Sequence, residues 1–196
     1  MADLSESILE STVDVIAEVG LEGMSIRVVA ARAGVSIGAV QHHFPTKQAL
    51  VVAAHDHVSA AFRHRAERAL TGRGAAFERL SALLRVLALV DEREADAHAA
   101  VRLAYVARAA NDLEIRERHV ESVEGIEHVL ERLLRAIDGG VPTIVARDTA
   151  ASLLALADGI GLARVASPER MPHERGAGLI DRALHALVTQ RPWARL

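Results

Sequence analysis

The stretch SIRVVAARAGVSIGAVQHHFPTK, residues 25–47, predicts two short helices joined by a tight turn. Ser25 is suited to cap the first helix, because a serine oxygen at this position accepts a hydrogen bond from a backbone N–H group of the first turn. Apolar residues follow at the three- and four-residue spacing of one helix face, namely Ile26, Val29, Ala30 and Ala33. This pattern predicts a first helix with one buried side.

A glycine and a serine mark the turn between the two helices. Gly34 suits the left-handed backbone conformation that commonly follows a helix, and Ser36 is placed to cap the second helix. Val40 and Phe44 are the inward positions of that second helix. Its outer surface carries Ile37, Gly38, Ala39, Gln41, His42 and His43. The stretch therefore predicts a helix-turn-helix with a largely polar outer face.

The charges around this stretch indicate contact with nucleic acid. No Asp or Glu occurs between Gly23 and His55, although the chain contains 26 acidic residues. A surface that approaches DNA phosphates excludes carboxylates, because each would repel the phosphate backbone. The window contains Arg27, Arg32 and the chain's only lysine, Lys47. The expected phosphate contacts are Ser25, Arg27, Thr46 and Lys47, and the expected major-groove residues are Ser36, Ile37, Gly38, Ala39, Gln41, His42 and His43.

The run from Val29 to Leu50 resembles the DNA-binding signature of the TetR family of bacterial transcriptional regulators. In that family Ala-Gly-Val-Ser-x-Gly-x-x-Tyr-x-His/Tyr-Phe-x-x-Lys-x-x-Leu spans the turn, the recognition helix and the start of the next helix. This chain departs from the motif at Gln41, which stands where the family most often has a phosphate-contacting tyrosine. The resemblance covers roughly residues 5 to 52. It implies a homodimeric repressor that binds a palindromic operator and is released by a small-molecule effector.

Composition and residue patterning predict an all-α fold of about nine helices. The chain is 51% hydrophobic but only 3% aromatic, so its core consists mainly of Ala, Val and Leu, and it contains no cysteine for disulfides or thiolate metal sites. The first residues lack the basic and apolar segments of a signal peptide, and no uninterrupted apolar run is long enough to span a membrane. We therefore expect a cytoplasmic protein without membrane contact. The net charge of −3 argues weakly against nucleic-acid binding, but the acid-free window gives the head a locally cationic surface.

The helix pattern divides the chain into a three-helix head, residues 1–46, and a helical-bundle body, residues 47–196, for ligand binding and dimerisation. Asp3 or Ser5 begins a first helix that runs to about Val19, and a long helix from about Thr46 to Leu70 joins head and body. Further breaks are expected at residues 71–74, 91–94, 111–112, 138–140, 167–172 and 192, with Trp193 in the tail.

Three possible chemical sites fail on spacing. Gly34-Val35-Ser36-Ile37-Gly38 fits the nucleophile elbow of serine hydrolases, but that elbow requires a strand before the serine, whereas a helix is expected here. The ten histidines include no H-x-x-x-H pair and no E-x-x-H motif. Lys47 is not preceded by the glycines of a phosphate-binding loop. We therefore expect no catalytic residue, no metal and no cofactor.

The body supplies candidates for two further surfaces. Side chains embedded in its helices could line an effector cavity: Phe62, Leu84, His98, Arg102, Tyr105, His119, Val123 and Asp158. Gly159 and Gly161 interrupt a helix and suggest close backbone approach, either within the subunit or between subunits. The TetR resemblance implies a dimer interface through the eighth and ninth helices, for which the candidates are Leu154, Asp158, Gly159, Gly161, Leu162, Ile180, Leu184 and Leu187.

Two alternatives to an effector-controlled repressor remain open from the sequence. One is a DNA-binding module that uses the same head constitutively, without an effector. The other is a helical-bundle enzyme that carries a helix-turn-helix. Thermal stabilisation by small molecules would distinguish the sensor from the constitutive module.

Overall fold

The computed structural model describes residues 4–90 and 95–190, and this part of the chain is helical with short connections. The helices are α1 (Leu4–Gly23), α2 (Ile26–Ala33), α3 (Ile37–His43), α4 (Lys47–Thr71), α5 (Ala76–Leu87), α6 (Ala95–Ala109), α7 (Leu113–Ile137), α8 (Thr143–Ala166) and α9 (His173–Gln190). The predicted all-α class is confirmed. Asp3, the polar break at 91–94, Pro192 and Trp193 lie outside the described residues.

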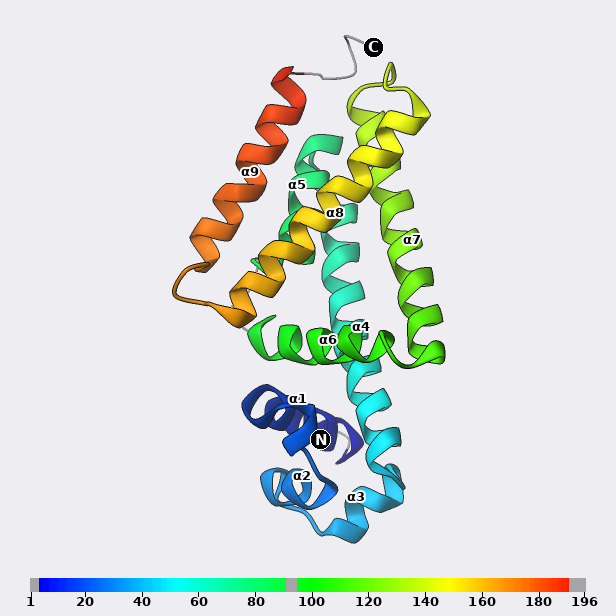
Figure 1. The fold of residues 1–196 in the computed structure, drawn as a ribbon, viewed down its shortest axis with the longest axis vertical. Coiled ribbons are helices and arrows are strands. Elements are labelled where there is room, and N and C mark those ends of the chain that lie inside the picture. The colour runs from blue at the N-terminus through cyan, green and yellow to red at the C-terminus, as the bar shows by residue number, and fades with distance from the viewer. Residues whose placement is uncertain (1–3, 91–94, 191–196) are drawn as a thin grey trace.

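The molecule consists of a small head and a larger helical bundle, which one long helix joins (Figure 1). Helices α1 to α3 form the head at one end, and α4 runs from the head into the bundle of α5, α7, α8 and α9. Helix α6 lies across the molecule between them, where it packs against α1 on one side and against α7 and α8 on the other. Helix α6 therefore contacts both the head and the bundle.

The head has a hydrophobic core of its own, which extends past the predicted boundary at residue 46. Ile8 and Ile16 of α1 pack there with Val29 and Val40 of the helix-turn-helix. The same cluster includes Leu50, Val51, Ala54 and Val58 from the first half of α4, and Val101 from α6. The first half of α4 is thus part of the head by packing, and α6 is attached to it.

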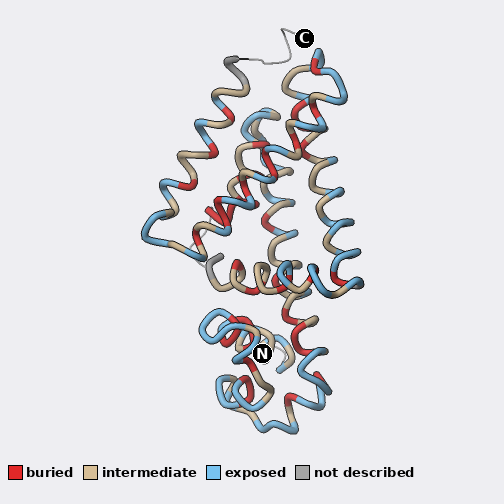
Figure 2. The backbone as a smooth tube through the Cα atoms, in the orientation of Figure 1, coloured by how far each residue is buried: buried red, intermediate tan, exposed pale blue. Residues whose placement is uncertain are grey.

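The second core fills the body and binds α5, α7, α8 and α9 together. Its buried residues include Leu80 and Leu84 of α5, Leu130 of α7, Leu153 of α8 and Ile180 of α9. Figure 2 shows buried residues along the inner faces of these helices and exposed residues on their outer faces. By length and composition alone α8 could cross a membrane, but most of its buried residues belong to this core.

The end of α1 differs from its sequence prediction. Gly20 interrupts the helix with a φ of 71°, and a further turn then extends to Gly23. Val19, at which the predicted helix ends, is 52% exposed. The break at Gly20 changes the direction of the chain, so that Met24 rather than Val19 fills the core, with 1% exposure.

Candidate functional site

Three hydroxyl residues fix the start of the three helices around the outer face of the head. Ser25 accepts a hydrogen bond from the Val28 N–H, Ser36 from the Ala39 N–H and Thr46 from the Ala49 N–H, at 3.3, 3.1 and 3.0 Å. Each hydroxyl acts here as an acceptor, so its own hydrogen remains free to be donated. The three N-termini also carry partial positive charge, which favours anions. The caps therefore place suitable phosphate donors at the edges of α2, α3 and α4.

The turn between α2 and α3 depends on Gly34. Its φ of 69° and ψ of 29° are left-handed, and the Val35 N–H donates to the Ala30 carbonyl oxygen at 3.0 Å. This six-residue hydrogen bond is the Schellman arrangement that ends many helices. The left-handed backbone of Gly34 therefore sets the angle between α2 and α3.

Replacing Gly34 with Ala should reduce the free energy of unfolding by about 1–2 kcal/mol, because an L-residue is strained in the left-handed conformation. A Cβ at Gly34 would meet nothing within 4 Å, so the effect is conformational rather than steric. Gly139→Ala is the matched control, since that position is equally open but has no positive φ. Urea unfolding of both variants measures the difference, and equal stabilities would contradict this reading of the turn.

The predicted major-groove residues share one outer surface. Val40 is fully buried and Phe44 is 9% exposed, so both anchor α3 to the head as expected. Gln41, His42 and His43 are exposed, and Ile37 is 45% exposed despite its apolar side chain. The rings of His42 and His43 meet edge to face with centroids 5.3 Å apart. Ser36 and Gly38 are exposed, while Ala39 is only partly so. An exposed helix with this mixture of apolar and hydrogen-bonding groups is suited to reading base edges.

The cations of the head are not equivalent. Arg32 is hydrogen-bonded to Glu18 of α1 and lies 4.0 Å from Asp14, so it joins α2 to α1. The hydrogen bond from Arg32 lowers the pKa of Glu18. Glu18 and Asp14 precede the acid-free window in the sequence, so the window gave no indication that Arg32 is paired. Lys47 is exposed, with Nζ 3.5 Å from the Glu22 carbonyl oxygen.

A cavity of about 480 Å³ lies in the body, where α4, α5, α6, α7 and α8 meet. This volume is typical of small-molecule sites. Six of the predicted ligand residues line it: Phe62, Arg102, Tyr105, His119, Val123 and Asp158. The other two, Leu84 and His98, do not line it; Leu84 is fully buried in the core of the body.

Several wall residues were not predicted from the sequence, including His55 and Ser59 of α4 and Arg118 of α7. His55, Ser59, Phe62 and Ala66 recur at helical spacing, so the pattern of α4 contained the information once one wall residue was known. Five helices contribute residues to the wall, so the pattern of any single helix does not predict the cavity.

Arg102 holds a central place in the cavity wall. Its guanidinium lies over the Phe62 ring, 4.8 Å from the ring centroid, and its Nη2 is 3.8 Å from Asp158 Oδ1. Burial raises the pKa of Asp158, against the opposing effects of Arg102 and His119. Burial also lowers the pKa of Arg102, although Asp158 partly compensates. Both charges are thus incompletely stabilised by the protein.

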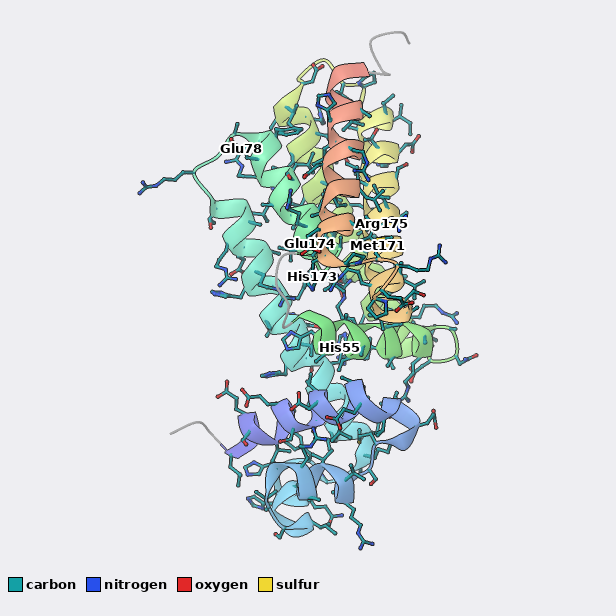
Figure 3. The ribbon with its side chains drawn as sticks, turned by 90° about the vertical axis from the view of Figure 1, so that its left-hand side faces the viewer. His55, Glu78, Met171, His173, Glu174 and Arg175 are labelled. Atoms are coloured by element: carbon teal, nitrogen blue, oxygen red, sulfur yellow. The ribbon has the colours of Figure 1, made fainter. Side chains whose placement is uncertain are left out.

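His55 connects the cavity to the head. Its ring stacks on that of Tyr105 with centroids 3.3 Å apart, and its Nε2 is 3.3 Å from Ser59 Oγ. His55 lies on α4 at the level of α6 (Figure 3). Burial lowers the pKa of His55; the adjacent Asp56 opposes this shift, whereas Arg102 and Arg118 add to it.

His55 should therefore make the protein less stable in mild acid. Because its pKa is lower in the folded state, the unfolded chain takes up the proton first, and stability falls as pH drops below about 6.5. Asp158 should have the opposite effect on stability in acid, because its raised pKa means that the folded state takes up the proton first. His55→Phe keeps a ring against Tyr105 and should reduce the fall in Tm between pH 7.5 and pH 5.5 (values chosen to bracket that of about 6.5). An unchanged pH profile would contradict a buried neutral imidazole.

The structure separates the predicted dimer residues into two groups. Leu154, Ile180 and Leu184 are at most 4% exposed and pack in the core of the body, so their assignment to a subunit surface is corrected. Gly161 also faces inward, because an added Cβ would lie 3.4 Å from Leu89 Cδ1. Leu187 is partly buried against the same core.

A second group remains available on the outside of α8. Gly159 is exposed and an added Cβ would meet nothing within 4 Å, while Leu162 is 50% exposed. They continue a line of exposed residues through Ala155 to Ile144, which is 62% exposed. Asp158 is exposed beside this line but also borders the cavity.

These features define a helix-turn-helix protein with an exposed recognition helix and a separate cavity-bearing body. Residues 8–54 match the model of the bacterial regulatory proteins of the tetR family, and residues 76–189 match that of the BetI-type transcriptional repressor C-terminal domain. The chain belongs to the TetR family of transcriptional regulators, and its body is of the BetI type.

Individual relatives agree with this assignment. The HTH-type transcriptional regulator BetI of Burkholderia thailandensis is 29% identical over 165 residues, which cover 79% of this chain and 78% of that protein. A transcriptional regulator from Rhodococcus sp. RHA1 is 33% identical, with a TM-score of 0.82 and coverage of 95% and 96% of the two chains. A regulator from Saccharomonospora viridis, solved in complex with choline, is 21% identical, with a TM-score of 0.80 and coverage of 96% and 97%. At that identity the last comparison shows the fold alone.

Proposed function

We propose that this regulator is a ligand-responsive repressor that binds a palindromic operator as a homodimer in the cytoplasm and is released by a small molecule. The observation that carries the proposal is the combination of an exposed recognition helix with a cavity of about 480 Å³ in the body. A constitutive DNA-binding module needs no such cavity. In the described cavity wall the Ser59 hydroxyl lies 3.3 Å from His55 Nε2, but the match to the tetR-family model favours a regulator over an enzyme.

Helix α6 supplies a physical route from the cavity to the head. Arg102 and Tyr105 line the cavity, and Arg108, one turn further, donates a hydrogen bond to Gln48 of α4 at 3.0 Å. The three residues are spaced by three, so they lie along one side of α6. A ligand that moves Arg102 would therefore also move the contact beside Lys47. The effector releases DNA only if it binds the released state more tightly than the DNA-bound state.

Dimerisation would set the distance between the two recognition helices. We infer that the exposed side of α8, with Ile144, Gly159 and Leu162, pairs with the same surface of a second subunit, and that α9 flanks it. Small residues at Ala155 and Gly159 allow two helix backbones to approach closely. Two heads held in this way would contact successive major grooves of a palindromic site.

Lys47→Ala should weaken specific and non-specific DNA binding alike. If Lys47 contacts a phosphate, its loss should reduce the slope of log affinity against log salt by about one per subunit. Arg32→Ala is the control, because Arg32 is already paired with Glu18 and Asp14 and should change the slope less. Fluorescence anisotropy on one operator at several salt concentrations measures both. An unchanged slope for Lys47→Ala would remove this residue from the interface.

Selection of bound sequences from random duplex DNA, followed by ligand screening on the selected site, tests the proposal as a whole. A palindromic consensus is expected from a symmetric dimer. Compounds that raise the Tm should also lower operator affinity if the cavity is a sensor. A palindromic site whose binding no stabilising compound changes would favour the constitutive module, and failure to select any sequence would contradict DNA recognition.

A further inference from the structure

We propose that the cavity takes a small amphipathic anion, a carboxylate with a hydrocarbon body, and that the Arg102 guanidinium binds its charged end. This inference rests on the proposed effector function of the cavity and specifies the chemical class of the ligand. It differs from a quaternary ammonium, which is the class of the choline bound by the structurally similar Saccharomonospora regulator.

The first support is an unused donor. Arg102 Nη1 is buried and has no hydrogen-bond partner among the described residues. Nη2 lies 3.8 Å from Asp158 Oδ1, which is longer than a hydrogen bond. A guanidinium presents its donors in a planar fork that matches a carboxylate, and leaving such a group unpaired inside a protein is costly. A ligand carboxylate would satisfy both Nη1 and Nη2.

The second support is the state of the aromatic rings. Recognition of a quaternary ammonium relies on open aromatic faces around the cation. Phe62 and Tyr105 of the cavity wall each have one ring face covered. The Arg102 guanidinium lies over Phe62, and the His55 imidazole stacks on Tyr105. Arg102 would also repel a cation bound beside Phe62.

The distribution of charge around the cavity agrees with an anion at its inner end. The wall contains Asp56, Arg63 and Glu67 of α4, Arg102 of α6, Arg118, His119 and Glu121 of α7, and Asp158 of α8. Asp56, Glu67 and Glu121 are exposed, as are Arg63 and Arg118, so solvent screens these charges more than that of Arg102. Buried Arg65 of α4 adds to the positive potential at Arg102. Asp158 is half-exposed and its Oδ1 stays 3.8 Å from Arg102 Nη2, beyond hydrogen-bond distance, so it does not occupy the guanidinium donors.

The rest of the wall fits a hydrocarbon. It is formed by Leu70, Leu83, Leu87, Val123, Ile126 and Val129. Burial of a hydrocarbon chain against these side chains is favourable, because it removes apolar surface from water. The ligand is thus expected to need both parts, an anionic end for Arg102 and an apolar body for this wall.

The test uses three ligands with the same eight-carbon chain and different ends: octanoate, octyltrimethylammonium and 1-octanol. Isothermal titration of the full-length protein should show octanoate binding at least about tenfold more tightly than octanol, as a charge-assisted hydrogen bond provides. Octyltrimethylammonium should bind more weakly than octanol. A cation that binds as tightly as octanoate, or an alcohol that does so, would overturn the proposal, and so would binding of none of the three.

Substitutions assign the effect to Arg102. Arg102→Gln should weaken octanoate about 10- to 100-fold and leave octanol within about threefold, whereas Arg102→Lys should retain part of the octanoate affinity. Asp158→Asn should strengthen octanoate, because it removes the competing acid. Arg63→Gln is the control, since this exposed arginine of the same wall should have little effect. Equal losses of octanoate and octanol in Arg102→Gln would show that the guanidinium charge does not select the ligand.

Release of the selected operator separates this inference from the proposed function. Octanoate that binds as described but leaves operator affinity unchanged would sustain the ligand class and contradict sensing. Release by octyltrimethylammonium but not by octanoate would sustain sensing and overturn the anionic class.

Discussion

Gly159→Leu is expected to produce a folded monomer whose affinity for a palindromic operator is lower by about 100- to 10,000-fold. The large effect arises because a dimer binds its second half-site at a high effective concentration, and this advantage disappears when the subunits separate. Gly159 is exposed with open space around its Cα, so leucine fits within the subunit. Leucine also has a better helix propensity than glycine, so the subunit itself should not lose stability.

Gly161→Leu is the matched variant for this experiment. Here an added Cβ already lies 3.4 Å from Leu89 Cδ1, and the Ala88 carbonyl oxygen lies 3.8 Å away. The rest of a leucine side chain would press α8 away from the end of α5, at a cost of about 1–3 kcal/mol. Sedimentation and urea unfolding should therefore show a stable monomer for Gly159→Leu and a destabilised protein for Gly161→Leu. A wild-type dimer with full operator affinity in Gly159→Leu would place the interface elsewhere.

Ile180→Ala is expected to lower the free energy of unfolding by about 2–5 kcal/mol, the range for removing a large aliphatic side chain from a packed core. Ile180 of α9 is fully buried, and it packs in the core of the body. The loss should be the same at low and high protein concentration, because the contacts lie within one subunit.

Leu162→Ala gives the contrasting result. Leu162 is 50% exposed, so its truncation should change subunit stability by only about 0.5 kcal/mol. If it lies at the subunit interface, the variant should instead dissociate at higher protein concentration than the wild type. An effect of Ile180→Ala that vanished on dilution would restore that residue to the interface and contradict the packing described above.

The helix-turn-helix could be predicted in detail because local residues determine it. Ser25, Gly34, Ser36 and Thr46 act on backbone groups at most four residues away, so their roles are written in consecutive sequence. The partners of Arg32 could not be found in this way, because Glu18 belongs to another helix and approaches only through the packing of α1 on α2.

The faces of α8 were harder to predict for a different reason. This helix is rich in Ala and Leu on most of its surface, so periodicity does not distinguish the side that faces its own subunit from a side that could face another. Leu154 and Leu162 look alike in the sequence, yet one is 4% exposed and the other 50%. The cavity presented a similar problem, because its wall combines residues from five helices.

Adjacent residues of α6 also limit how freely the head can be exchanged between relatives. Val101 is buried in the core of the head, while Arg102 lines the cavity of the body. A chimera that joined another regulator's first 46 residues to this body would place a foreign α1 against Val101, Ala97 and Ala104. Such hybrids should function only when these three α6 positions are transplanted with the head. The unit of modular exchange in this fold is therefore discontinuous in the chain.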